Sequence, residues 1–287
     1  MALDWKRDGA DWPNRELSRF VATRGARFHV QRGGAGKRVL LLHGAGAATH
    51  SWRDIVPRLV PEFDVLALDL PGQGFSTGRA DRFTLALMAQ DIGALLETEG
   101  FVPDLVVGHS AGAAIGLRMA LDGHAAPGPV LSLNGALAPF RGPAGVLFPP
   151  LAKLLSLNPL TGAFFARTAS SSSSVRNLIE GTGSRIDQEG LALYRRLIAD
   201  SGHVSATLSM MARWDLKPLM ADVPRLRVPV ILALGQNDRA VPPETTRALA
   251  GAFQDARVLD FTGLGHLMHE EDPATFAGLI ARTVPGG

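Results

Sequence analysis

The segment LVVGHSAG at residues 105–112 decides the fold. Its first three residues form a short apolar run, its last five fit the pattern G-x-S-x-G, and an Ala-rich helical pattern follows. The pattern alone is weak, because a chain rich in glycine produces such matches by chance. Its context predicts a sharp turn from a buried strand into a helix, where only small neighbours fit and the serine hydroxyl stands clear of the sheet. Ser110 is therefore the candidate nucleophile.

Similar short apolar runs, each bounded by turn residues and followed by a helical pattern, recur on both sides of this segment. Runs that are apolar on both faces are typical of parallel strands covered by helices. Residues 20–31 alternate loosely before a Gly-Gly pair and predict an antiparallel hairpin. The sequence thus predicts an α/β protein with a mostly parallel central sheet of about eight strands flanked by helices. The predicted strands are Val39–Leu42, Val65–Leu68, Leu105–Val107, Val130–Leu133, Val230–Leu234 and Val258–Phe261, and the predicted helices are Ser51–Val60, Thr84–Thr98, Ala111–Leu121, Pro243–Phe253 and Pro273–Thr283.

The regular alternation of strands and helices is interrupted once, between Leu137 and Pro229. About ninety residues lie there, whereas a crossover between parallel strands needs roughly a dozen. We expect a helical cap (lid) at residues 139–215, inserted into an α/β core made of residues 1–138 and 216–287. The Ser170–Ser174 run is expected to be a flexible connector. The predicted helices of the cap are Leu147–Leu157, Gly162–Ala169, Gly190–Asp200 and His203–Trp214.

The stretch Phe148–Phe165 carries one Lys and no acidic residue. Such an apolar stretch is either the underside of a lid over a pocket or a patch that faces a membrane or a partner. We favour the lid, and peripheral membrane contact through the cap stays open.

The composition excludes several classes of function. The 29 Lys and Arg residues nearly balance the 27 Asp and Glu residues, so the net charge of +2 gives no reason to expect nucleic acid as a partner. The absence of cysteine rules out disulfides, thiolate metal sites and a Cys nucleophile. The first residues lack the apolar stretch of a signal peptide, and no segment has the apolar length of a transmembrane helix. We therefore expect a cytoplasmic protein.

A serine hydroxyl is a poor nucleophile until a base takes its proton, so an acid and a histidine are needed later in the chain. Asp238 and His266 each follow a predicted strand. Because the carboxyl ends of parallel strands meet at one edge of a sheet, both side chains are expected near Ser110. We predict the catalytic triad Ser110, Asp238 and His266, and we interpret His269 as a structural residue.

Acyl transfer also needs hydrogen-bond donors for the negative charge that develops on the carbonyl oxygen. A small-residue loop, HGAG at residues 43–46, follows a predicted strand. The backbone N–H groups of Ala45 and Ala111 are the predicted oxyanion donors, and His43 is interpreted as a brace for this loop. The triad accounts for His266 without a metal, so we expect neither a metal ion nor a cofactor.

These motifs resemble the α/β-hydrolase fold family and extend over nearly the whole chain. The resemblance implies the α/β-hydrolase fold and acyl chemistry at Ser110. A serine at the elbow argues against the dehalogenase and epoxide-hydrolase branches, which use a carboxylate nucleophile. Gln73 departs from the family, whose members commonly carry His there, and Asn134 lies where some branches place their acid, although Asp238 is the better candidate. The motifs are HGAG at 43–46, DLPGQGFS at 69–76, the elbow at 108–112, GQND at 235–238 and GH at 265–266.

The amino-terminal and inserted segments carry a narrower resemblance, to the BchO-type family. These are magnesium-chelatase accessory proteins of bacteriochlorophyll biosynthesis in phototrophic bacteria. The resemblance implies a pathway rather than a reaction, with a tetrapyrrole as the small-molecule substrate and magnesium-chelatase subunits as partners. The matching segments are DWKRDGADWPNR at 4–15, GAGAATHSWR at 44–53, GSRID at 183–187 and MMARWDL at 210–216.

Three functions stay open, because a fold does not fix a function. The chain is a serine hydrolase of tetrapyrrole metabolism, a non-catalytic accessory protein that binds a porphyrin or a chelatase subunit, or a small-ester carboxylesterase or C–C hydrolase. Aromatic residues of the cap could line a pocket for a flat macrocycle, although such residues more often form the core of the cap itself. The candidate pocket residues are His109, Phe148, Phe164, Phe165, Tyr194 and Trp214.

Overall fold

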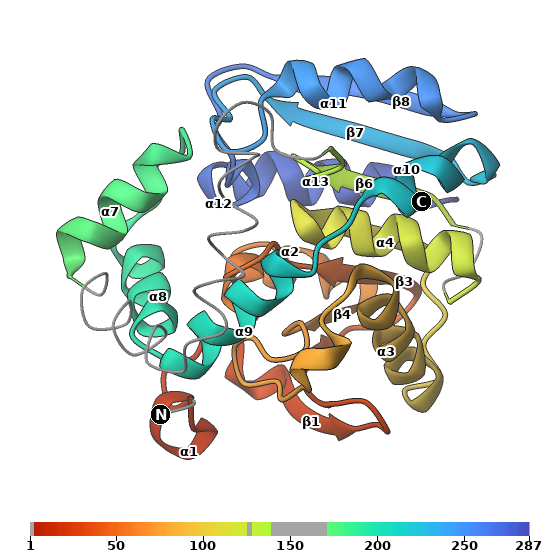
Figure 1. Cartoon of the computed structure of the whole chain (residues 1–287). Helices are drawn as coiled ribbons and strands as arrows, with labels where there is room; N and C mark the ends of the chain where they lie inside the picture. Colours follow the sequence, from red (N-terminus) through yellow and green to blue (C-terminus); the bar gives the residue numbers. More distant parts are fainter. Residues whose placement is uncertain (1–2, 125–127, 139–170, 287) are drawn as a thin grey trace.

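The computed structural model describes residues 3–124, 128–138 and 171–286. Its described strands form one eight-stranded sheet in the order β1-β2-β4-β3-β5-β6-β7-β8, with helices on both faces (Figure 1). The β1–β2 and β2–β4 pairs are antiparallel, and the remaining pairs are parallel. The predicted α/β class, the mostly parallel sheet and the amino-terminal hairpin are confirmed. The strands are β1 (Ser18–Ala22), β2 (Arg27–Gly33), β3 (Lys37–Leu42), β4 (Phe63–Leu68), β5 (Leu105–His109), β6 (Val130–Leu133), β7 (Val230–Gly235) and β8 (Ala256–Phe261).

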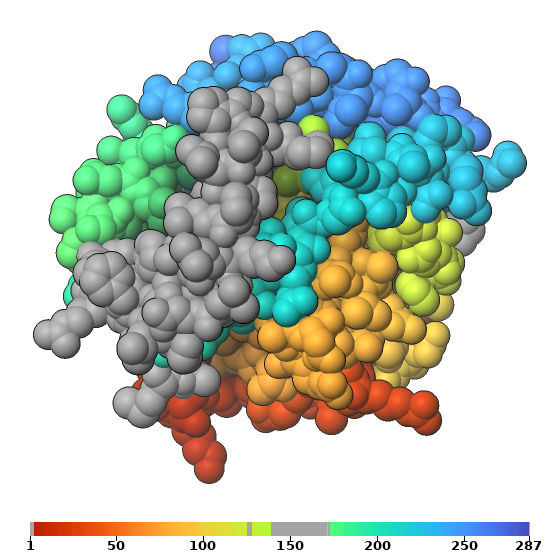
Figure 2. All heavy atoms as spheres, in the orientation of Figure 1, coloured from red at the N-terminus to blue at the C-terminus, as the bar shows by residue number. Residues whose placement is uncertain are grey.

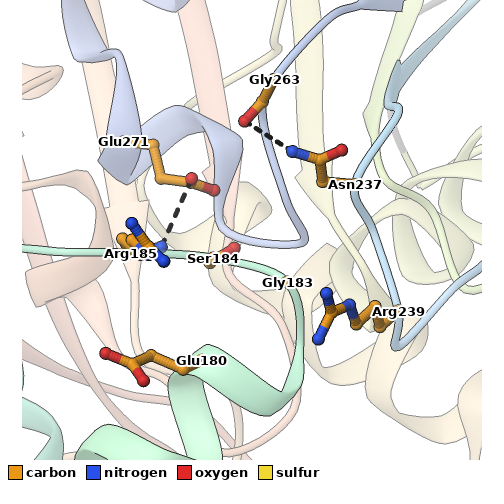
Figure 3. A pocket seen from close by; sticks show the side chains of 8 residues that line it. All are labelled: Glu180, Gly183, Ser184, Arg185, Asn237, Arg239, Gly263 and Glu271. Atoms are coloured by element: carbon orange, nitrogen blue, oxygen red, sulfur yellow. Dashed lines mark hydrogen bonds between the residues drawn. The ribbon is translucent and has the colours of Figure 1, made fainter.

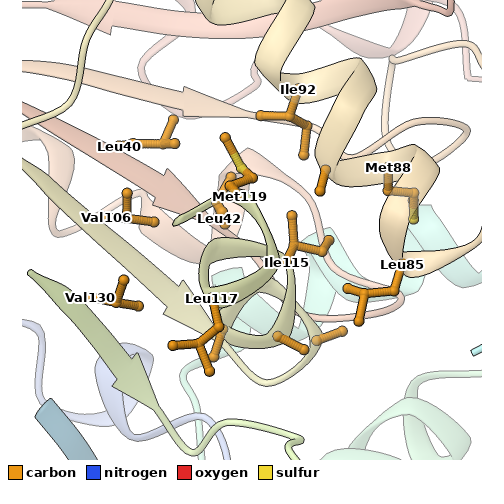
Figure 4. Packing of buried hydrophobic residues seen from close by; sticks show 14 of the residues in the cluster. Leu40, Leu42, Leu85, Met88, Ile92, Val106, Ile115, Leu117, Met119 and Val130 are labelled. Carbon is orange, nitrogen blue, oxygen red and sulfur yellow. The ribbon is translucent and has the colours of Figure 1, made fainter. Parts of the chain in front are cut away.

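One hydrophobic core lies between the sheet and the helices α3 (Leu85–Thr98) and α4 (Ala111–Asp122). Figure 4 shows Leu40 and Val106 of the sheet facing Ile115 of α4 across this core. The second core lies on the opposite face, where alternate residues of the same strands meet α2 (Val56–Leu59) and α13 (Pro273–Thr283). Every residue of β4 and β5 is buried, as expected of strands covered on both faces.

Two predicted helices are divided in the structure. The predicted helix Ser51–Val60 is instead a 3-10 turn, Thr49–Trp52, followed by α2. Pro57 lies in the first turn of α2, where its missing N–H is tolerated, and it cannot continue a helix that began earlier. The predicted helix Pro243–Phe253 is α11 (Pro243–Leu249) followed by a 3-10 turn.

The segment between β6 and β7 contains α7 (Ser172–Gly181), α8 (Gln188–Ile198), α9 (Ser201–Ala212) and α10 (Lys217–Asp222). Figure 1 shows α7 and α8 beyond the end of the sheet toward which β7 points. Figure 2 shows the turquoise part of the chain, which includes α9 and α10, lying on the orange part that follows β4. The two remaining α-helices of the described chain are α1 (Trp5–Asp8) and α12 (Met268–Glu271).

The serine run at residues 170–174 differs from its prediction. Ser171 is the N-cap of α7, and its Oγ accepts a hydrogen bond from the N–H of Ser174 at 3.1 Å. The expectation of a flexible connector is therefore wrong for residues 171–174, because a serine hydroxyl is among the best caps for a helix start. The predicted helices at 147–157 and 162–169, and the apolar stretch at 148–165, lie outside the described residues.

Candidate active site

Ser110 lies at a sharp turn between β5 and α4, with φ of 50° and ψ of −114°. Residues other than glycine rarely adopt a positive φ, so this turn is strained in the way that a nucleophile elbow requires. Neighbouring backbone holds it, because the N–H of Ser110 donates to Leu133 O and the N–H of Ala136 donates to Ser110 O, both at 3.0 Å. Within the described residues, Ser110 Oγ makes no hydrogen bond.

The two glycines of the elbow are fixed by close backbone contacts. A Cβ atom at Gly112 would lie 2.2 Å from Leu42 O, and one at Gly108 would lie 2.4 Å from the backbone nitrogen of Ala113. Such contacts cannot be relieved by a side-chain rotation, so only glycine fits. A Cβ at Gly44 would lie 3.1 Å from Ser110 Cβ, which brings the loop at residues 43–46 directly against the serine.

Asp238 and His266, which are 28 positions apart in the chain, are joined by a hydrogen bond of 2.7 Å between His266 Nδ1 and Asp238 Oδ2. Asp238 follows β7 and is 4% exposed. Its other oxygen, Oδ1, accepts hydrogen bonds of 2.8 Å from the N–H groups of Ala240 and Val241, which fixes the carboxylate. This bond can orient the imidazole and keep its proton on Nδ1, which leaves the lone pair of Nε2 for use as a base.

Several side chains hold the loop that carries His266. Asn134 Nδ2 donates to Gly265 O at 2.8 Å and to His266 O at 3.0 Å, while Asn134 Oδ1 accepts from the N–H of Gly235 at 2.8 Å. His109 Nε2 also donates to His266 O, at 2.9 Å. Asn134 therefore links the ends of β6 and β7 to the histidine loop and uses both polar atoms of its side chain in doing so.

The loop at residues 43–46 is braced by His43. His43 Nδ1 donates to Gly44 O at 2.7 Å, and His43 Nε2 accepts from the N–H of Leu70 at 2.9 Å. The carbonyl and N–H of one trans peptide point in opposite directions, so this bond to Gly44 O directs the N–H of Ala45 away from His43. The predicted brace is present.

A cluster of buried aromatic rings lies behind the candidate triad. The ring of His109 lies 4.8 Å from that of His266 and 4.5 Å from that of His269, which in turn lies 4.6 Å from the ring of Trp52. Burial lowers the pKa of His269 to about 3 and that of His109 well below its usual value. Both are therefore neutral at pH 7, and His269 has no hydrogen-bond partner among the described residues.

A charged cluster, buried at Arg53 and Glu270 and exposed at Asp187, ties α8 to α12. Arg53 Nη1 donates to Glu270 Oε2 at 3.2 Å, and Arg53 Nη2 donates to Asp187 Oδ1 at 2.8 Å. Tyr194 Oη donates to Glu270 Oε1 at 2.7 Å. Burial raises the pKa of Glu270 to about 8, against the hydrogen bonds of Tyr194 and Arg53, which favour the ionised form.

A polar cavity of about 500 Å³ lies beside the loops that carry Asp238 and His266. Figure 3 shows Arg239 on one side of the Gly183–Ser184 turn and Arg185 and Glu271 on the other. Glu271 is bound to the histidine loop, since its Oε1 accepts from the N–H of Gly265 at 2.9 Å. The full lining is Glu180, Gly183, Ser184, Arg185, Asn237, Arg239, Gly263 and Glu271.

The structure places only part of the predicted pocket. Phe148, Phe164 and Phe165 lie outside the described residues. His109 is buried below the histidine loop, and Tyr194 is buried with its hydroxyl on Glu270. Trp214 is partly buried against the first core.

The described part of the chain has neither a metal-binding cluster nor a membrane-spanning helix. No group of three His, Cys, Asp or Glu side chains there is arranged to hold a metal ion. No helix there combines the length and apolar character needed to cross a membrane.

Comparisons with known proteins identify the family. The sequence profile described as "Alpha/beta hydrolase family" matches residues 39–279. The chain belongs to the alpha/beta hydrolase family. Among solved structures, its fold is similar to that of the epoxide hydrolase CorEH (TM-score 0.77, 22% identity, 93% of this chain and 97% of the other). It is also similar to an esterase from Exiguobacterium antarcticum (TM-score 0.75, 20% identity, 92% and 98%). At these identities the likeness shows the fold alone.

Two curated relatives are similar over most of their length. The chain is 41% identical over 253 residues to "Magnesium-chelatase 30 kDa subunit" of Rhodobacter capsulatus, which covers 88% of each chain. It is 30% identical over 231 residues to "Pimeloyl-[acyl-carrier protein] methyl ester esterase" of Methylococcus capsulatus, which covers 77% of this chain and 84% of the other. The first match confirms the resemblance to proteins named for magnesium chelatase.

Several residues that hold the site are not predicted by the sequence. The sequence marks Asn134 only as a position that carries the acid in some branches, and Gln73 only as a departure from the family. It gives Ser184 no role, yet Ser184 Oγ accepts from the N–H of Leu267 at 2.7 Å. Asn134 and Gln73 follow predicted strands, which indicates a place near the site but not their partners, and Ser184, between α7 and α8, has no such signal.

Proposed function

We propose that this chain is a serine hydrolase whose triad is Ser110, His266 and Asp238. The observation that carries the proposal is the 2.7 Å hydrogen bond between His266 and Asp238, at the same sheet edge as the strained Ser110 elbow. The inserted segment at 139–215 acts as the cap of a core formed by residues 1–138 and 216–287.

In the proposed reaction, Ser110 Oγ bonds to the carbonyl carbon of an ester while His266 Nε2 takes its proton. Asp238 stabilises the imidazolium that forms. The N–H groups of Ala45 and Ala111 donate to the oxyanion, a contribution worth about 10²–10³ in rate for one such donor in other hydrolases. The alcohol leaves with the proton from His266, and water, deprotonated by His266, then releases the acid and restores Ser110.

The substrate class is proposed from the relatives. The 41% identical relative is named for magnesium chelatase and the 30% identical one for methyl ester hydrolysis. We therefore propose an ester or related acyl group of a tetrapyrrole intermediate of bacteriochlorophyll biosynthesis as substrate, acted on in the cytoplasm near chelatase subunits. The second candidate is a non-catalytic accessory role. Its support is the name of the 41% identical relative, which is called a subunit and not a hydrolase.

The first test is covalent labelling with a fluorophosphonate, which phosphonylates activated serines. Ser110→Ala is expected to lower labelling to background, at least about 10³-fold below the wild type, because the nucleophile is lost. Ser205→Ala, an exposed position on α9, serves as the matched control and is expected to label like the wild type. An unlabelled wild type would contradict the activated serine and favour the accessory role.

The pathway is tested by expressing wild type and Ser110→Ala in a phototrophic bacterium that lacks its own copy of the gene. The catalytic proposal predicts that bacteriochlorophyll accumulates only with the wild type. If the wild-type protein is labelled and cells with Ser110→Ala still accumulate a normal amount of bacteriochlorophyll, the role in the pathway is binding and not catalysis.

A further inference from the structure

Three side chains hold the turn at residues 44–47, one at each successive peptide unit. His43 Nδ1 donates to Gly44 O at 2.7 Å. The next unit is held on the other side, where the N–H of Gly46 donates to Gln73 Oε1 at 2.8 Å. The third is held by His203, whose Nε2 donates to Gly46 O at 3.1 Å. The first two side chains belong to loops after β3 and β4, whereas His203 belongs to α9 of the inserted segment.

His203 bonds to both loops at once. Its Nδ1 accepts a hydrogen bond of 3.0 Å from the N–H of Gly74, while its Nε2 donates to Gly46 O. The ring is 3% exposed, and burial lowers its pKa to about 4. A neutral ring has one donor and one acceptor nitrogen, and both are used here. The backbone of His203 is fixed by the start of α9, where the N-cap residue Asp200 accepts a hydrogen bond from the N–H of His203 at 2.6 Å through its Oδ1.

The packing around His203 leaves little freedom between α9 and these loops. A Cβ at Gly72 would lie 2.9 Å from Ala206 Cβ, and one at Gly46 would lie 3.6 Å from Thr207 Cγ2. Gln73 Nε2 also donates to the sulfur of Met210 at 3.1 Å. Successive turns of α9 therefore contact the loop that supplies Ala45 and the loop that begins at Asp69.

We infer that His203 is a positioning residue for the oxyanion loop at residues 43–46. Through His203, the inserted segment fixes the direction of the Ala45 N–H. Gly46 has φ of 80°, a conformation with few intrinsic restraints for glycine, so the turn relies on its hydrogen bonds to stay in one orientation. Without the bond to Gly46 O, the peptide between residues 46 and 47 keeps one bond, from the N–H of Ala47 to Gly44 O at 3.2 Å. Gly44 O belongs to the peptide that carries the Ala45 N–H, so a shift of the 46–47 peptide is passed to that N–H through this bond. This inference rests on the proposed function, because it assigns a catalytic use to Ala45.

The test compares two substitutions that each keep one of the two hydrogen bonds. His203→Asn places an oxygen near the position of Nδ1 and keeps the bond from Gly74, but it does not reach Gly46. His203→Gln places an amide nitrogen near the position of Nε2 and keeps the bond to Gly46 O. Fluorophosphonate labelling is measured as kinact and KI, because the phosphonyl oxygen occupies the oxyanion site only as the bond to Ser110 forms.

We expect His203→Asn to lower kinact roughly tenfold or more with KI within about twofold, and His203→Gln to stay within about threefold of the wild type. Ser205→Ala is the control on the same helix. All variants are compared below the lowest melting temperature measured by circular dichroism. If His203→Asn does not fold, His203→Gln alone decides, and a kinact below a third of the wild type contradicts the inference.

The two proposals fail in different ways. An unlabelled wild type contradicts the proposed function. A labelled wild type with an unchanged kinact in His203→Asn contradicts the positioning role alone. Equal loss in His203→Asn and His203→Gln also contradicts it, because a merely structural histidine would not be rescued by the variant that keeps the Gly46 bond.

Discussion

The two sides of the candidate triad are held by different forces. Ser110 is positioned by backbone packing, with Gly112 so close to Leu42 O that a Cβ would lie 2.2 Å from it. His266 is positioned by side-chain hydrogen bonds, chiefly from Asn134 and His109. The elbow is therefore held by close backbone contacts, whereas the histidine loop is held by side chains, two of which are more than one hundred positions away.

The inserted segment also contacts the two sides differently. Within the described residues, no side-chain hydrogen bond from α7, α8 or α9 reaches Ser110. The loop after His266 is bonded to that segment, because Ser184 accepts from the N–H of Leu267 at 2.7 Å. The inserted segment is therefore bonded to the histidine loop through Ser184 and to the loop beside Ser110 through His203, but not to Ser110 itself.

The largest effect is expected from Gly112→Ala, which adds a Cβ to the closely packed backbone of the Ser110 elbow. The new Cβ meets carbonyl oxygens of residues 42 and 43 that cannot move independently, so we expect the free energy of unfolding to fall by at least about 3 kcal/mol and labelling to be lost. Gly251→Ala is the control, because a Cβ there meets nothing within 4 Å. Urea unfolding checks both variants, and a Gly112→Ala protein as stable as the control would show that the elbow is not sterically fixed.

A smaller loss of stability is expected from Asn134→Ala, which removes side-chain hydrogen bonds that hold the His266 loop. The carbonyl of Gly265 and the N–H of Gly235 lose their side-chain partner, and His266 O keeps only its bond from His109, so we expect a loss of about 2 kcal/mol in unfolding free energy and slower labelling. Asn134 has φ of 46°, so Asn134→Gly is the control that relaxes the backbone without restoring the bonds. Recovery of labelling in Asn134→Gly would mean that backbone conformation, and not hydrogen bonding, holds the histidine loop.

The same difference explains how much the sequence could predict. The elbow, the strands and the order of Ser110, Asp238 and His266 follow from local patterns, because small residues and apolar runs act on their immediate neighbours. The roles of Asn134 and His203 could not be predicted in this way. Each depends on a partner brought close only by the folded sheet, and the sequence carries no mark that pairs Asn134 with Gly265 or His203 with Gly46.

The smallest effect at pH 7 is expected from His269→Phe, three positions from the candidate base. His269 lies between the rings of Trp52 and His109 and has no described hydrogen-bond partner, so a planar apolar ring should change stability by no more than about 1 kcal/mol and leave labelling within about threefold.

The stabilities of His269→Phe and the wild type are expected to differ at acid pH. Because burial lowers the pKa of His269 to about 3, the unfolded chain binds a proton near pH 6.5 that the folded protein refuses until about pH 3. As the pH falls below 6.5, the free energy of unfolding of the wild type therefore decreases more steeply than that of the variant, because unfolding of the wild type takes up one proton more. Between pH 7 and pH 5 this difference amounts to about 2 kcal/mol in favour of the variant, measured by urea unfolding at both values. Parallel curves would mean that His269 takes up its proton in the folded state, which would place it in contact with solvent or with the His266 hydrogen-bond network.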